Sequence, residues 1–234
     1  MAFALAGCQS NEEDTETSEE TTSIDINDHV TDYCYGEGEY TDSSGNEYSY
    51  SYIVPEITDD TDGAKEINES IREETESIAE EGLSSVESKT SLICTKIFWE
   101  GFTYDNIAGI VIHEQIDWTN TDYYLVYNYD LENESALTNA DLIEKLGVSE
   151  DELLDAAATA IRDKFSELND DNKNMDEYDF AYEYNEDIIN ELTIDNIRFY
   201  ANESGDLYIC TEVAALAGAE SYEYEIPLNI TAVQ

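Results

Sequence analysis

The sequence predicts an α+β fold, in which a mostly antiparallel β-sheet is packed by two or three amphipathic helices. Strand-like runs rich in Tyr, Val and Ile occur within residues 48–131 and again within residues 194–228. Helical patterns fall between these runs without regular βαβ alternation, which favours the α+β class. Hydrophobic residues make up 41% of the 234-residue chain, and its 18 tyrosines argue against wholesale disorder.

The first predicted elements are a strand and a helix. Residues 48–54 alternate aromatic and small polar side chains and then turn apolar, which predicts a strand that ends at Pro55. A helix opens at Asp62 and Gly63, and Gly82 is predicted to end it. The apolar face of this helix carries Ile67, Ile71 and Ile78.

Three strands are predicted next, over residues 91–99, 107–118 and 123–131, and a subdivision of the folded part near residue 132 stays open. Thr138 and Asp141 form a predicted capping box for a short helix that ends at Gly147. Ser149 and Glu152 predict a second such box. The helix that follows carries an apolar stripe of Leu153, Leu154, Ala157, Ile161, Phe165 and Leu168, interpreted as core packing.

The last part of the chain has a polar segment and three more strands. Residues 169–187 are acidic and aromatic without a clean period, which predicts a loop with uncertain helix. Strands are predicted over residues 194–200, 207–214 and 222–228.

The start of the chain resembles a lipoprotein signal. Leu5, Ala6, Gly7 and Cys8 match the lipobox, in which the cysteine becomes the lipidated first residue of the mature protein. A signal peptide also carries a basic segment and a longer apolar segment, so we expect that the true start lies upstream. We interpret residues 1–8 as the remnant of this signal and Cys8 as the lipid anchor. The expected location is extracytoplasmic, on the cell membrane, with the lipid as the only membrane attachment.

The segment after Cys8 predicts a tether. Residues 9–23 are acidic and rich in Ser and Thr, without an apolar residue that would build a core. We therefore predict a disordered acidic tether over residues 9–30 and a folded α+β domain over residues 31–234. A flexible spacer of this kind holds a folded domain clear of the membrane.

The charge of the chain restricts its partners. The chain holds 57 acidic and 9 basic residues, for a formal net charge of -48. Such a surface repels phosphate backbones, so nucleic acid is excluded as a partner. It attracts cationic proteins and divalent cations, although solubility or adaptation to a salty habitat is the simpler explanation of the charge.

Three further cysteines, Cys34, Cys94 and Cys210, leave the disulfide state open. Any one pair leaves a free thiol, and an oxidising exterior favours one disulfide. Cys94 and Cys210 lie in apolar runs, so buried free thiols are an equal alternative. Without a CxxC motif, no structural zinc site is predicted.

Two metal-like patterns are incomplete. His113-Glu114-Gln115-Ile116-Asp117 begins like HExxH, but Asp117 stands where the second histidine belongs and the run favours a strand. Asp170, Asn172, Asn174 and Asp176 have the spacing of a calcium loop, but its glycine and terminal glutamate are missing. We predict neither a metal site nor a cofactor, and weak calcium binding over residues 170–176 stays open.

Tyrosines offer the one candidate binding feature. Those at positions 48, 50, 52, 123, 124, 127 and 129 would form an exposed aromatic surface for sugars or a protein, or half of each set would be core. No nucleophile or phosphate-binding motif is present, and paired carboxylates carry no information among 57 acids. We therefore predict no enzyme and no catalytic residue.

The second half resembles a known family. The pattern Tyr-Asn-Tyr-Asp-Leu at 127–131, the run 136–143, the run 199–207 and Glu-Ile-Pro-Leu at 225–228 are similar to the extracellular domain of RsiV, a lysozyme-sensing anti-sigma factor. The likeness covers roughly residues 48–230 and implies an α+β fold outside the cytoplasm. It also implies that a cationic protein such as lysozyme is a partner. The chain shows neither the sigma-binding segment nor the membrane-spanning helix of those sensors, and no ligand contact can be transferred.

The function predicted from the sequence is therefore a surface-anchored, non-catalytic binding lipoprotein that captures a cationic protein such as lysozyme. The alternatives are a hydrolase that modifies the cell wall and a structural lipoprotein of the envelope.

Overall fold

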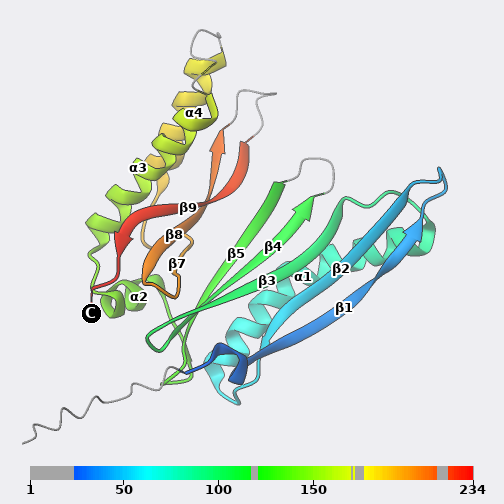
Figure 1. Ribbon diagram of the computed structural model, residues 1–234, viewed down its shortest axis with the longest axis horizontal. Helices are drawn as coiled ribbons and strands as arrows, with labels where there is room; N and C mark the ends of the chain where they lie inside the picture. The colour runs from blue at the N-terminus through cyan, green and yellow to red at the C-terminus, as the bar shows by residue number, and fades with distance from the viewer. Residues whose placement is uncertain (1–23, 117–120, 170, 172–176, 215–220, 234) are drawn as a thin grey trace, which may run out of the picture.

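The computed structural model describes residues 24–116, 121–169, 171, 177–214 and 221–233. It confirms the α+β class: two sheets, with helices packed against each (Figure 1). The first sheet has the order β1-β2-β3-β4-β5-β6 and the second the order β7-β8-β9. Every strand pairing is antiparallel except the short parallel contact of β2 with β3.

The first sheet and helix α1 (Asp62–Ser88) share one core. Its strands are β1 (Val30–Thr41), β2 (Glu47–Ile57), β3 (Cys94–Tyr104), β4 (Ile107–Ile116), β5 (Thr121–Asp130) and β6 (Ser135–Ala136). The α1 residues Ile67 and Ile71 pack against alternate residues of the central strand β4, Ile110 and Ile112. Both isoleucines of α1 belong to the stripe that the sequence predicts.

The second sheet has its own core with three helices. Its strands are β7 (Phe199–Ala201), β8 (Asp206–Ala214) and β9 (Ser221–Thr231), and its helices are α2 (Asn139–Leu146), α3 (Glu150–Asn169) and α4 (Glu177–Glu191). The α3 stripe residues Leu153, Ala157, Ile161 and Phe165 are buried there, so their interpretation as core is confirmed.

The two sheets meet along the face of the first sheet that looks away from α1. Val111 of β4 packs against Tyr200 of β7 and Cys210 of β8 in a small third core. Polar contacts reinforce this junction, because Asn128 Nδ2 donates to the Phe199 carbonyl over 2.9 Å. In Figure 1, α3 and α4 accordingly lie on the outer side of the second sheet.

The helix caps follow the sequence prediction closely. Thr138 and Asp141 form the capping box of α2, and Gly147 ends that helix with φ of 66°. At the start of α3, Ser149 Oγ accepts the Glu152 amide over 3.3 Å, which is one of the two bonds of the second predicted box. These contacts are local, so the sequence alone specifies them.

Two predicted ends are wrong. Helix α1 does not end at Gly82 but continues to Ser88 and is capped by Lys89 in the left-handed region. Gly82 is needed for packing instead, because a Cβ there would lie 2.0 Å from the hydroxyl of Tyr52. Strand β2 does not end at Pro55, which pairs with Asp32 of β1. The pairing of β2 with β3 covers only Ser51 and Tyr52, so no β3 carbonyl requires an amide donor from Pro55.

Two further predictions need correction. Within the segment 169–187, residues 177–187 form the start of helix α4, whose Ala181 and Asn185 are buried. Strand β7 begins only at Phe199 rather than at residue 194, and Thr193 and Asn196 form a turn before it.

The folded part begins earlier than the sequence predicts. Ile26, in the short 3-10 helix η1 (Ile26–Asp28), is 8% exposed and packs into the first core. Val30 is also buried. Residues 24–30 are therefore part of the folded body and not of the tether, whereas Cys8 and residues 9–23 lie outside the described residues.

Candidate functional site

The outward surface of α1 is strongly acidic. Seven exposed carboxylates in its middle turns, which we call the acidic helix face, are Glu66, Glu69, Glu73, Glu74, Glu76, Glu80 and Glu81. The two cations of α1 already have partners, since Lys65 pairs with Asp60 and Arg72 with Glu56. Carboxylates this close together repel one another. A cation that binds near them reduces this repulsion.

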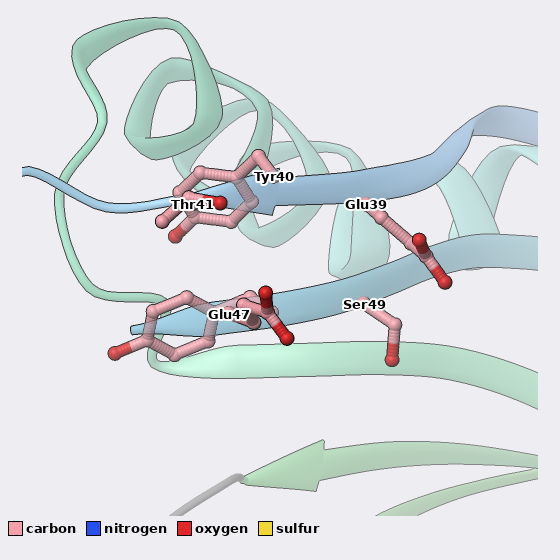
Figure 2. A pocket seen from close by; sticks show the side chains of 6 residues that line it. Glu39, Tyr40, Thr41, Glu47 and Ser49 are labelled. Carbon is pink, nitrogen blue, oxygen red and sulfur yellow. The ribbon is translucent and has the colours of Figure 1, made fainter. Parts of the chain in front are cut away.

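The end of the β1–β2 hairpin combines aromatic and acidic side chains. Tyr40 and Tyr48 face each other across the two strands, with ring centroids 5.2 Å apart and planes inclined by 17°. Glu39 and Glu47 each precede one of these tyrosines, so their side chains project from the opposite face of the hairpin. The four residues line a surface depression of about 520 Å³ together with Thr41 and Ser49 (Figure 2). We call Tyr40, Tyr48, Glu39 and Glu47 the hairpin-tip site.

The hairpin turn holds this site in place. Asp42 accepts the side-chain amide of Asn46 over 2.9 Å and the backbone amides of Asn46 and Ser44, each over 2.8 Å, and these bonds lower the pKa of its carboxyl. The Ser43 amide donates to the Lys89 carbonyl at the end of α1 over 2.9 Å. The hydroxyl of Tyr40 donates to the carbonyl of Thr90 just beyond. The hairpin tip is thus fastened to the C-terminal end of α1.

This arrangement suits a cationic side chain. A ring face attracts a positive charge on one side of the hairpin, and the carboxylates on the other side offer charge-assisted hydrogen bonds. Neither Glu39 nor Glu47 forms an ion pair with a residue that the structure describes. Because the turn fixes the site in advance, little entropy is lost when a ligand binds.

The predicted aromatic surface is only partly exposed. Tyr52 and Tyr129 are fully buried, so the half-core interpretation holds for them. The hydroxyl of Tyr52 donates to the Cys94 carbonyl, and that of Tyr129 donates to Asp59. Tyr123 is 50% exposed, but it lies on β5 and not at the hairpin tip. The sequence does not single out Tyr40, because no strand is predicted over the residues of β1.

His113 lies on strand β4, which confirms the strand that the sequence favours for this run. Its ring stacks on Phe98 with centroids 4.4 Å apart and is 6% exposed. Nδ1 lies 3.3 Å from Asp122 Oδ2, and Nε2 lies 3.3 Å from Glu100 Oε2 without hydrogen-bond geometry. This is an imidazole between two carboxylates at the junction of the sheets.

The described residues contain no group of three or more His, Cys, Asp or Glu placed to hold a metal ion. Asp117 of the HExxH-like run and the calcium-loop residues Asp170, Asn172, Asn174 and Asp176 lie outside the described residues.

The three cysteines within the described residues are free thiols. Cys34 is exposed on β1, whereas Cys94 and Cys210 are buried in different cores. Burial raises the pKa of the Cys94 thiol to about 12 and raises that of Cys210 as well, with carboxylates nearby adding to both shifts. The two buried thiols are therefore protonated and inert at neutral pH.

No family model matches the chain, and comparison with curated proteins finds no relative. The likeness to the RsiV extracellular domain thus stays a prediction. In the part of the chain that the structure describes, no helix combines the length and the apolarity that crossing a bilayer would need.

Proposed function

We propose that this chain is a surface-anchored, non-catalytic binding lipoprotein that captures a cationic protein such as lysozyme. The observation that carries the proposal is the hairpin-tip site, where a tyrosine pair and two glutamates without ion-pair partners among the described residues lie on the two faces of a hairpin end that the turn fixes. The net charge of -48 brings a cationic protein toward the surface, and the hairpin tip supplies the specific contact.

Charge alone gives a fast association rate rather than a lasting complex. Aromatic side chains flanked by charges are typical of the few interface residues that dominate binding energy. The hairpin tip offers Tyr40 and Tyr48 for lysine or arginine side chains, while the acidic helix face adds a general attraction that salt weakens. The likeness to lysozyme-sensing domains supports the same class of partner.

The test is calorimetric titration of hen lysozyme into the chain at about 0.15 M salt. Glu39→Gln combined with Glu47→Gln removes both carboxylates of the hairpin-tip site. We expect the Kd to rise about fivefold, which corresponds to about 1 kcal/mol. The matched control is Glu183→Gln combined with Asp187→Asn on α4, where both residues are exposed and the same two charges are lost.

The control pair should change the Kd less than twofold. An equal loss in both double variants would show that net charge acts alone and that the hairpin tip is not the site. Absence of any lysozyme binding, or turnover of cell-wall fragments by the chain, would overturn the proposal itself.

The anchor is tested separately. In cells that express the gene with its native leader, Cys8→Ser should move the protein from the membrane fraction to the soluble fraction and abolish labelling by radioactive palmitate. Unchanged fractionation would remove the lipid anchor from the proposal and leave the binding site untouched.

A further inference from the structure

A second cavity lies on the face of the first sheet that α1 covers, which is the face away from the second sheet. It is under the C-terminal half of α1. It has a volume of about 400 Å³ and opens between α1 and the ends of β3, β4 and β5. The side chains that matter are Ile78, Ile93, Cys94, Glu114, Ile116 and Tyr123, and we call this cavity the Glu114 pocket. Its size falls in the range of small-molecule sites.

Small residues keep the pocket open. Gly82 of α1 lines the pocket without a side chain, and its close contact with the Tyr52 ring brings α1 near the sheet here. Ser85 and Ser91 line the mouth with short side chains. Ile93 and Tyr123 stay 49% and 50% exposed, so two large apolar side chains border the opening without being covered.

Glu114 is an unusual residue for this place. It lies on the central strand β4, paired with Ile97 of β3 on one side and Tyr123 of β5 on the other. Its carboxyl forms no ion pair or hydrogen bond with a described residue. Burial raises the pKa of this carboxyl to about 7, and the charges of Glu223 and Glu74 raise it further in the same direction.

The charges that act on Glu114 are those of Glu223 on β9 and Glu74 on α1, and Glu81 of α1 also lines the pocket. Glu223 is itself paired with Arg198, which precedes β7. The Cys94 thiol, which also lines the pocket, stays neutral, because burial raises its pKa, and the Tyr127 hydroxyl contacts Ser70. None of the residues that line the pocket is a lysine or an arginine.

An unpaired carboxylate in an apolar cavity is costly, and a bound cation offsets that cost. The ligand must then carry one positive charge and an apolar body. We propose that the Glu114 pocket binds a primary organic amine, with its ammonium on the Glu114 carboxylate and its aliphatic chain against Ile78, Ile93 and Ile116. A chain of about six carbons fits such a volume.

The same chemistry occurs in a free alkylamine and in a lysine side chain of a protein partner. The pocket binds the ammonium only when Glu114 is ionised, so protons compete with the ligand. With a carboxyl that titrates near neutrality, the amine should bind about tenfold more weakly at pH 6 than at pH 8.

The experiment titrates the purified 234-residue chain with hexylamine, hexanol and hexanoate, and follows binding by NMR shifts of backbone amides in β4 and α1. Hexylamine should bind more tightly than hexanol at pH 8, hexanoate should not bind, and only the amine should weaken at pH 6. Nα-acetyl-lysine methylamide, titrated in parallel, separates the two sources. Binding comparable to hexylamine assigns the pocket to lysine side chains, and much weaker binding assigns it to free amines.

Glu114→Gln should cost hexylamine about tenfold in Kd and remove its pH dependence, while hexanol binding persists. The matched control is Glu81→Gln at the rim, which removes one charge and should leave both properties nearly unchanged. Ser85→Phe fills the mouth and should abolish binding of both hexylamine and hexanol.

Equal affinity for hexylamine and hexanol, or an unchanged response of Glu114→Gln, would overturn this proposal. The outcome is independent of lysozyme capture, because that is measured with variants of the hairpin tip. The pocket proposal therefore stands or fails separately from the proposed function.

Discussion

Replacement of Glu114 by glutamine should stabilise the protein in a pH-dependent way. The folded state raises the pKa of this carboxyl from 4.5 to about 7, because burial disfavours the charged form. Folding therefore favours the protonated carboxyl, so the residue lowers stability as pH rises from 4.5 toward 7. If the whole pKa rise of about 2.5 acted on stability, it would lower the free energy of unfolding by about 3.4 kcal/mol, at about 1.36 kcal/mol per pH unit.

Glu114 is partly solvated, so we expect about 1–2 kcal/mol of this amount to appear. At pH 8, Glu114→Gln should raise the free energy of unfolding by that amount and the Tm by about 2–8 °C. At pH 4.5, where the wild-type carboxyl is protonated in the folded state, the difference should be close to zero.

The assay is urea unfolding followed by intrinsic fluorescence at pH 4.5, 6 and 8, at about 0.3 M salt to screen the general repulsion. Glu81→Gln is the control, since it removes an equal charge from the exposed rim of the same pocket. A stability gain that is equal for both variants, or that does not depend on pH, would refute the assignment of Glu114 to an apolar environment.

Three further outcomes are expected. Arg198→Met breaks the paired contacts with Glu223 that hold β9 to the first sheet, and should lower the free energy of unfolding by about 2 kcal/mol in urea titrations. In the folded protein, a thiol reagent such as DTNB should modify Cys34 within minutes and Cys94 and Cys210 only after denaturation, and fast reaction of all three would contradict their burial. Raising NaCl from about 0.05 M to about 0.5 M should raise the Tm by screening the charge, and calorimetry showing a decrease would exclude that effect.

Local rules predicted the parts of this fold whose causes are local. The capping box of Thr138 and Asp141 and the glycine end at Gly147 depend on neighbouring residues, so the sequence alone contains them. The end of α1 was wrong because Gly82 serves a contact with Tyr52, which is distant in sequence. The sequence alone does not distinguish a glycine that makes room for an aromatic ring from a glycine that ends a helix.

Helix α4 shows the same limit in another form. Its buried residues are a small alanine, Ala181, and an asparagine, Asn185, which donates to the Ala181 carbonyl and accepts the Ala214 amide. A pattern of large apolar residues cannot reveal such a helix, because tertiary hydrogen bonds replace part of the apolar stripe. Helix α4 could not be predicted from its own residues, because the buried Asn185 depends on its hydrogen bond with Ala214 of β8.

The candidate sites were harder to predict than the elements. Among 57 acids, nothing marks Glu114 except its alternation on β4, and the neighbours that bury it come from three other elements. The tyrosine prediction identified position 48 but not Tyr40, because the stack depends on the register of β1 with β2. Register is fixed by tertiary packing and is not visible in the composition of either strand.

The central claim is that this acidic protein binds cationic proteins through their positive charges. The most direct measurement is titration of the chain with native hen lysozyme and with lysozyme whose lysines have been acetylated, at the same salt concentration. We predict saturable binding of native lysozyme that is lost when the lysines are neutralised. Equal binding of both forms, or binding of neither, would contradict the claim.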